Sequence, residues 1–170
     1  MFALTLYISK CYRTVPVTIL VIVLFFSATA IAEVYITADE AVRNIFPGLE
    51  RYEEKIHQLG SQQAKVFTVF KNDEIAGWAV ALDEMGKIKP ITFLVGIDIQ
   101  HRVLAVYILE YRDLFGADIK RKSFLRQFIG KTSKDALRLG RDIDAVTSAT
   151  VSSKAATAAV KKALKITEGL

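Results

Sequence analysis

Four apolar segments separated by short polar turns limit the possible folds of this chain more than any other feature. The segments are rich in β-branched and aromatic residues and cover residues 64–70, 75–82, 91–97 and 102–109. The polar segments between them are too short to contain a helical crossover, so consecutive strands are expected to be antiparallel neighbours. The middle of the chain therefore predicts an antiparallel sheet.

Helical patterns lie before and after these strands. Thr37-Ala38-Asp39-Glu40 is an N-cap pattern for a short helix that ends before Pro47. Further elements are expected as follows: a polar helix over residues 49–59, a helix over 119–129, a turn over 133–139 and a final helix after Thr150. Strands grouped in the middle and helices at the ends predict a single α+β domain, an antiparallel sheet flanked by helices.

Small hydroxyl residues gather where the final helix begins, within residues 142–153. Residues 151–166 are strong helix formers, so Thr150 is expected to be the N-cap. A helix N-terminus presents unpaired N–H groups and roughly half a positive charge, and Lys154 adds a full charge. A phosphate attached to Thr150, or resting on it, would be stabilised there. The alternative is that Thr150 simply caps a surface helix.

Thr147-Ser148-Ala149-Thr150 resembles the (Ser/Thr)-Gly-Ala-Thr flavinylation motif of the FMN-binding domain family. That family includes the C subunit of the sodium-pumping NADH:quinone oxidoreductase and the G subunit of the Rnf complex. The resemblance implies that Thr150 carries FMN through a phosphoester, installed from FAD by a flavin transferase, with Thr147, Ser148 and Ala149 beside the cofactor. Ser148 replaces a Gly, which matters if that position needs a positive φ. Asp142 and Asp144 are expected to orient this loop, to assist the transferase or to cap a turn.

Other segments extend the resemblance over most of residues 38–166. Residues 86–98 are similar to the family's Gly-Lys-x-x-Pro-Ile strand, and residues 124–131 to its Phe-x-x-Gln-Phe-x-Gly-Lys segment. Asp113-Leu114-Phe115-Gly116 falls where the respiratory-complex members have Glu-Thr-Pro-Gly, so the resemblance implies that Asp113 and Gly116 contact the cofactor. Most nearby aromatic residues are expected in the core, and one or two against the flavin ring. These residues are Trp78, Tyr107, Tyr111 and Phe115.

Residues 1–32 have the composition of a secretory signal peptide. They contain no acid, two basic residues, an apolar run, and Ala30-Ile31-Ala32 just before the first acid. Cleavage there leaves residues 33–170 as one FMN-binding domain. A retained anchor is the alternative, because residues 14–32 are uncharged and a spanning helix needs about 20 residues. Either outcome predicts an extracytoplasmic domain, in the periplasm or on the outer face of the cytoplasmic membrane.

Cysteine, histidine and charge content argue against several kinds of site. The single Cys11 precedes residues 33–170, which therefore have no thiol for a disulfide, an iron–sulfur cluster or a haem attachment. Glu53, Glu54 and His57 would share part of a helix face, which is a weak metal pattern. The formal net charge is +5 without a long basic block, so no nucleic-acid partner is predicted. Lys120-Arg121-Lys122 fits a solvated helix face, or a docking site for an anionic redox partner.

Three functional hypotheses follow. The first is an exported covalent flavoprotein that carries electrons on FMN, matures through a flavin transferase and meets membrane or periplasmic redox partners. The second is a flavin-free binding or assembly module of a membrane redox complex. The third is a terminal reductase of a small exported substrate, against which the small size and the absence of a second domain count.

Overall fold

The structure, a computed structural model, describes residues 33–170; the predicted signal peptide or anchor, residues 1–32, lies outside the described residues. The elements follow in this order: β1 (Glu33–Val34), α2 (Ala38–Ile45), β2 (Arg51–Leu59), β3 (Gln62–Lys71), β4 (Glu74–Met85), β5 (Pro90–Asp98), β6 (Val103–Tyr111), η1 (Ala117–Lys120), α3 (Lys122–Leu125), η2 (Arg126–Phe128) and α4 (Thr150–Thr167). Within residues 33–170, no helix is both long and apolar enough to cross a membrane.

The strands form a six-stranded antiparallel sheet in the order β1-β6-β5-β4-β3-β2. The predicted α+β class and antiparallel sheet are thus confirmed, and the four predicted strands are β3 to β6. Asn72 and Asp73 have φ of 52° and 58°, and they close the turn between β3 and β4. Two residues with positive φ match the right-handed twist of a hairpin.

One predicted helix is wrong: residues 51–59 form strand β2 instead. This segment pairs with β3 along its whole length, from Arg51 opposite Phe70 to Leu59 opposite Gln62. Gly60, with φ of +61°, lies in the tight turn that joins the two strands. The segment is polar because it is an edge strand with mostly exposed side chains, and pairing with β3 outweighs its low strand propensity.

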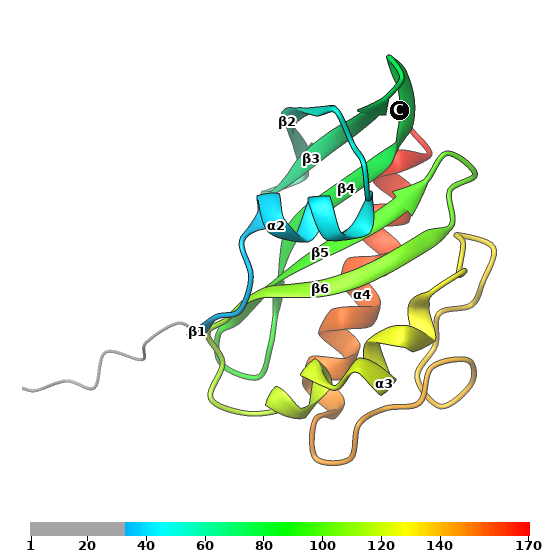
Figure 1. Cartoon of the computed structure of the whole chain (residues 1–170). Helices are drawn as coiled ribbons and strands as arrows, with labels where there is room; N and C mark the ends of the chain where they lie inside the picture. The colour runs from blue at the N-terminus through cyan, green and yellow to red at the C-terminus, as the bar shows by residue number, and fades with distance from the viewer. Residues whose placement is uncertain (1–32) are drawn as a thin grey trace, which may run out of the picture. The chain divides into compact units, whose positions relative to one another are not determined.

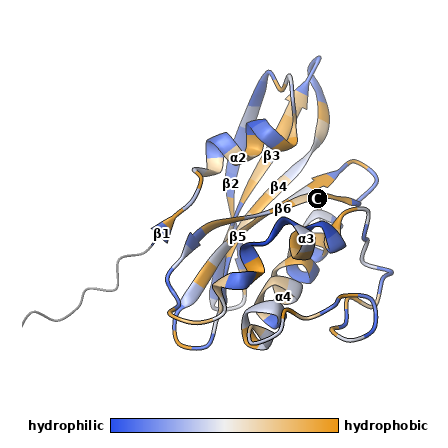
Figure 2. Cartoon of the chain, turned by 60° about the horizontal axis from the view of Figure 1, so that its bottom comes forward, coloured by the Kyte–Doolittle hydropathy of each residue, from blue (hydrophilic) through white to orange (hydrophobic). Residues whose placement is uncertain are grey.

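Helices cover the two faces of the sheet (Figure 1). The long helix α4 packs over β4 and β5, and its Ala156, Ala159 and Val160 join the larger cluster of buried apolar side chains. Helix α2 packs on the opposite face, where Ala41 and Val42 belong to a second cluster. Apolar side chains of the central strands therefore enter the clusters on both faces, and Figure 2 shows these strands as largely apolar along their length. The small alanine side chains allow α4 to lie close to the sheet along its length.

The predicted helix over residues 119–129 is broken into η1, α3 and η2. Ile119, Phe124 and Phe128 are all buried, which is the pattern that suggested a continuous helix. Arg121 interrupts it with an extended backbone, φ −59° and ψ 127°. Gly130 has φ of +78°, the left-handed conformation that glycine commonly adopts where a helical segment ends. The short helix α2 begins at the predicted cap, because Thr37 accepts a hydrogen bond from the Glu40 N–H.

Candidate functional site

Helix α4 begins at Thr150 itself, whereas a helix capped by Thr150 would begin one residue later. Ala149 is the N-cap residue, and no side chain caps the helix. The prediction that Thr150 caps α4 is therefore wrong: Thr150 is the first helical residue, because Ala149 already accepts the first intrahelical bond, from the Ser153 N–H at 2.8 Å. An uncapped helix start leaves its first N–H groups open to a ligand.

The hydroxyl groups around this start divide into buried and exposed ones. Ser152 and Ser153 are buried, and Ser153 Oγ donates to the Ala149 carbonyl at 2.9 Å and accepts from the Val146 N–H at 3.2 Å. Thr147, Ser148 and Thr150 are exposed. A large group attached from outside can reach the exposed hydroxyls without unfolding the helix, and Thr150 carries the one on α4 itself.

Ser148 has a left-handed backbone, with φ of +64°. Its hydroxyl donates to the Thr147 carbonyl at 2.5 Å. Left-handed backbone conformations favour glycine, because residues with a Cβ are destabilised by about 1–2 kcal/mol there. Position 148 therefore is a positive-φ position, as the comparison with the Gly of the motif anticipated, and the serine occupies it at some conformational cost.

A pocket of about 220 Å³ opens beside Thr150. Three segments far apart in the sequence form it: Lys87 from the turn between β4 and β5, Phe115 and Gly116 after β6, and residues 148–152. Lys87 Nζ lies over the Phe115 ring, 4.3 Å from its centroid. A positive charge, an exposed aromatic ring and an uncapped helix start thus face one small space.

Asp113 holds the Lys87 turn in place. Its carboxylate accepts hydrogen bonds from the Lys87 N–H, from the Ile88 N–H at 3.1 Å and from the Leu114 N–H at 2.7 Å. A Cβ on Gly86 would meet Asp113 Oδ2 at 2.2 Å, so the turn needs glycine for this close approach. Burial by itself would raise the pKa of Asp113, but these N–H groups together hold that pKa below its ordinary value.

A buried contact joins Gly116 to the first turn of α4. Ser152 Oγ lies 3.2 Å from the Tyr111 hydroxyl and 3.4 Å from the Phe115 carbonyl, to which Tyr111 also donates. Burial raises the pKa of Tyr111, so its hydroxyl stays protonated as a donor at neutral pH. Gly116 has φ of +81°, and a Cβ there would meet Ser152 Oγ at 2.3 Å.

The loop before the motif is held by two side chains. The Gln127 amide accepts from the Asp144 N–H at 2.7 Å and donates to the Asp144 carbonyl at 3.2 Å. The Asp142 carboxylate accepts from the N–H groups of Leu137 and Arg138, each at 2.7 Å, and these bonds lower its pKa, the one from Arg138 most. Asp142 therefore closes a turn, and Asp144 is positioned through its backbone.

The structure brings some predicted site residues together and places others apart. Ser148, Ala149, Thr150 and Gly116 line the pocket, whereas Asp113 does not line it and supports Lys87 from behind. Thr147 borders a neighbouring hollow of about 600 Å³, which it shares with Ser148.

Among the aromatic candidates, Phe115 lines the pocket and Tyr111 supports it through Ser152. Trp78 instead stacks on His101, with ring centroids 5.3 Å apart, and Tyr107 packs against the α2 cluster. Lys154 borders a different hollow, so the charge at the pocket comes from Lys87. Lys87 lies in the segment that is similar to the family's Gly-Lys-x-x-Pro-Ile strand, but it was not predicted as a site residue, because only the folded sheet brings it near Thr150.

No metal centre emerges from residues 33–170, where no group of three or more metal-ligating side chains was found. Glu53, Glu54 and His57 lie on β2, so the helical spacing that suggested a shared face does not apply. Neighbouring residues of a strand point to opposite faces of the sheet.

The pocket has the features that a phosphate ester requires. The first turn of α4 has no capping side chain, and Lys87 supplies a positive charge to the lining of the pocket. Gly116 has no side chain, so the backbone of the 115–116 segment approaches α4 closely. A phosphate bonded to the exposed Thr150 would meet N–H donors and a cation together. These residues thus fit the phosphate end of a flavin nucleotide.

Comparison with known protein families identifies a domain in this chain. A sequence search found no similar curated protein. Residues 86–165 match the family model described as the FMN-binding domain. The matched stretch begins at the turn that carries Lys87 and ends within α4, so it includes all three segments of the pocket. Residues 86–165 of this chain therefore carry the similarity to the FMN-binding domain family, which supports binding of FMN by this part of the chain.

Proposed function

We propose that the protein is an exported electron carrier whose FMN is attached through a phosphoester to Thr150. The observation that carries the proposal is the exposed Thr150 hydroxyl at an uncapped helix start, beside a pocket whose three segments all lie in the matched domain. The isoalloxazine of bound FMN supplies one- and two-electron chemistry. The similarity of residues 147–150 to the flavinylation motif supports the covalent linkage.

The residues around Thr150 have distinct roles in this proposal. Thr150 Oγ forms a bond to the flavin-side phosphorus of FAD, the pyrophosphate P–O bond breaks, AMP leaves and the hydroxyl proton is lost. Lys87 and the first N–H groups of α4 offset the remaining phosphate charge. Phe115 offers an exposed ring on which an aromatic group can rest, with 48% of its surface accessible.

The proposal also includes export of the domain and exchange of electrons with redox proteins outside the cytoplasm. The order of charged, apolar and small residues in 1–32 supports translocation of residues 33–170 across the cytoplasmic membrane. A flavin transferase outside the cytoplasm would then load FMN, and membrane or periplasmic redox proteins would exchange electrons with it. Covalent attachment suits this compartment, because a cofactor that dissociates there would diffuse away.

Intact mass and in-gel flavin fluorescence of protein exported together with a flavin transferase test the proposal. The wild type and Ser61→Ala, a control at an exposed hydroxyl in the turn between β2 and β3 and outside the motif, are expected to gain the mass of FMN less one water and to fluoresce after denaturation. Thr150→Ala is expected to gain nothing. The same masses show whether residues 1–32 were removed. An unmodified wild type in this assay would support the flavin-free binding module instead.

A further inference from the structure

The sheet has an open edge along the middle of β6. At one end, β1 pairs with Glu110 and Tyr111, and the Tyr35 N–H donates to the Leu109 carbonyl at 3.0 Å. At the other end, Val103 accepts from the Gly130 N–H at 2.7 Å and donates to the Lys131 carbonyl at 2.9 Å. Within residues 33–170, no strand or loop pairs with the outer edge of β6 between these two points.

The side chains of β6 show which backbone groups point outward. Val103, Val106, Ile108 and Tyr111 all enter the cluster under α4. In a regular strand, side chains on one face are two residues apart, but Val103 to Val106 and Ile108 to Tyr111 are each three residues apart. Each longer step coincides with a register shift, the first opposite Gly96/Ile97 and the second opposite Thr92/Phe93. Side chains on one face of a strand share the direction of their N–H and C=O groups. Because the groups of Val103 point outward, those of Val106 and Ile108 do too.

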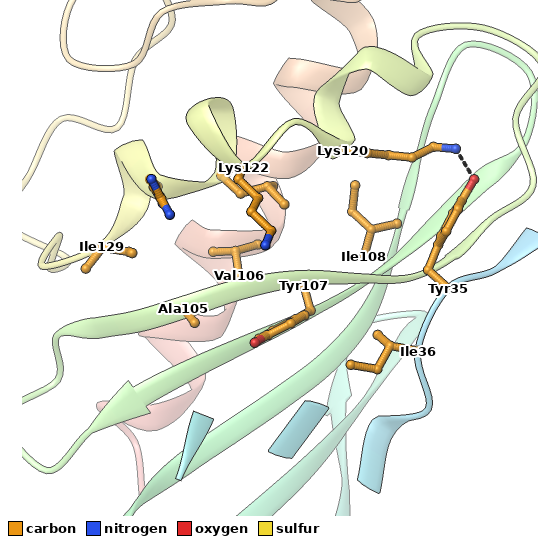
Figure 3. Close-up of a pocket in the computed structure, with 11 residues that line it drawn as sticks. Tyr35, Ile36, Ala105, Val106, Tyr107, Ile108, Lys120, Lys122 and Ile129 are labelled. Carbon is orange, nitrogen blue, oxygen red and sulfur yellow. Dashed lines mark hydrogen bonds between the residues drawn. The ribbon is translucent and has the colours of Figure 1, made fainter. Parts of the chain in front are cut away.

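These outward groups face a groove of about 500 Å³ (Figure 3). β6 forms one wall with Val106 and Ile108, and the segment from η1 to residue 129 forms the other with Leu125 and Ile129. Ile129 is exposed, with 51% of its surface accessible. The groove is therefore apolar between its walls, with unpaired backbone donors and acceptors along one side.

The rim of the groove is positively charged. Lys122 and Arg126 are exposed, and neither makes an ion pair with any residue that the structure describes. Lys120 closes one end, where it contacts Glu33 at 3.3 Å and the Tyr35 hydroxyl. Figure 3 shows Lys120 and Lys122 extending from the helical wall beside the groove. Two cations thus remain to meet acidic groups of a ligand.

We propose that this open edge binds an extended acidic segment of a partner protein, which adds to β6 as a further strand. The free stretch, residues 104–108, spans roughly 17 Å at about 3.3 Å per residue, enough for a short strand. Outward groups of Val106 and Ile108 would supply the ladder bonds, the apolar walls would cover alternate side chains, and Lys122 and Arg126 would pair with acids. The proposal depends on the sheet edge and not on the flavin.

Charge favours such a partner over other occupants. Two copies of this chain joined edge to edge would bring the cationic rims together, which is unfavourable. Residues 1–32 contain no acid, so the chain's own N-terminal segment lacks the complementary charge. The groove also lies near the Thr150 pocket: Lys120 Nζ is 5.2 Å from the Tyr111 ring, and the Tyr111 hydroxyl contacts Ser152. A partner docked here would lie close to the proposed cofactor.

A designed peptide tests the proposal on the full domain. The probe is a blocked peptide of about eight alternating valine and glutamate residues, long enough for the roughly 17 Å edge. One control peptide carries lysine in place of glutamate, and a second carries N-methylated valines that cannot donate ladder bonds. Fluorescence anisotropy reports binding, and amide hydrogen exchange by NMR reports Val106 and Ile108. The protein variant is Lys122→Glu with Arg126→Glu, and its control is Lys161→Glu on α4.

The glutamate peptide is expected to bind, to protect the amides of Val106 and Ile108, and to bind more weakly in high salt. The double charge reversal should weaken its binding by about tenfold, whereas Lys161→Glu should not. Neither control peptide should compete. Equal binding of the lysine or N-methylated peptide, or protection at other strands, would overturn the proposal. Protection of the same two amides that rises with protein concentration and without peptide would assign the edge to a second copy.

Discussion

Gly116→Ala should cost more stability than its backbone conformation alone can explain. Gly116 has φ of +81° and Gly130 has φ of +78°, yet a Cβ at Gly130 would meet nothing within 4 Å. Gly130→Ala therefore measures the conformational cost alone, about 1 kcal/mol after the smaller entropy of the unfolded alanine chain is allowed for. At Gly116 the new Cβ would also lie 2.3 Å from Ser152 Oγ and 3.1 Å from Ser152 Cβ.

Ser152 must therefore move when Gly116 is replaced. Its displacement weakens the contact with Tyr111, about 1 kcal/mol, and overpacks the base of the pocket by about 1–3 kcal/mol. Gly116→Ala should then lower the free energy of unfolding by about 3–5 kcal/mol in total, measured by urea denaturation with circular dichroism. In a Ser152→Ala background, Gly116→Ala should lower the free energy of unfolding by less, because Ser152 Oγ, the atom nearest to the new Cβ, is absent. Equal losses for Gly116→Ala and Gly130→Ala would refute the steric argument.

Three other substitutions test the support of the pocket. Asp113→Asn should lower the free energy of unfolding by about 1–3 kcal/mol at pH 7, because an amide accepts the three N–H groups less well. Folding lowers the pKa of Asp113, so its carboxylate stabilises the fold above the ordinary pKa of 3.8, and this stabilisation is lost as the pH falls through the lowered pKa of the folded state. Urea midpoints compared across pH 2–6 should therefore fall less steeply with acid in the variant than in the wild type. Tyr111→Phe should cost about 1 kcal/mol by the same method, and no loss would contradict the role of its hydroxyl. Ser148→Gly should change stability by less than about 1 kcal/mol, since relief of the left-handed backbone and the entropy of glycine oppose each other, and a larger loss would contradict the positive-φ argument.

The fold was predictable where local signals and tertiary pairing agree. β3 to β6 follow from apolar patterns and from turns too short for a helix, and α2 follows from the cap at Thr37. β2 was not predicted, because its polar side chains serve an edge position that only pairing with β3 creates. The tight turn at Gly60 was the one local signal for that hairpin. The two-residue strand β1 is too short to leave any pattern in the sequence.

The candidate site was predictable only where it is contiguous. Residues 147–150 stand together in the chain, so their position before a helix was evident from the sequence. Lys87 and Phe115 approach Thr150 through the packing of the sheet and α4, which no local pattern specifies. The support that Asp113 gives to the Lys87 turn was equally hidden, because it depends on backbone groups from a hairpin about 25 residues earlier.

The order of elements also has a consequence for folding kinetics. β2 to β6 form a meander in which each strand pairs with its sequence neighbour, so its contacts are local and can form early. Helix α4 packs on β4 and β5, which precede it by more than 50 residues, and this closure is expected to be slower. The pocket beside Thr150 does not exist until that docking step. Its formation therefore marks completion of the fold, and an enzyme that recognised the assembled pocket would distinguish finished chains from those still folding.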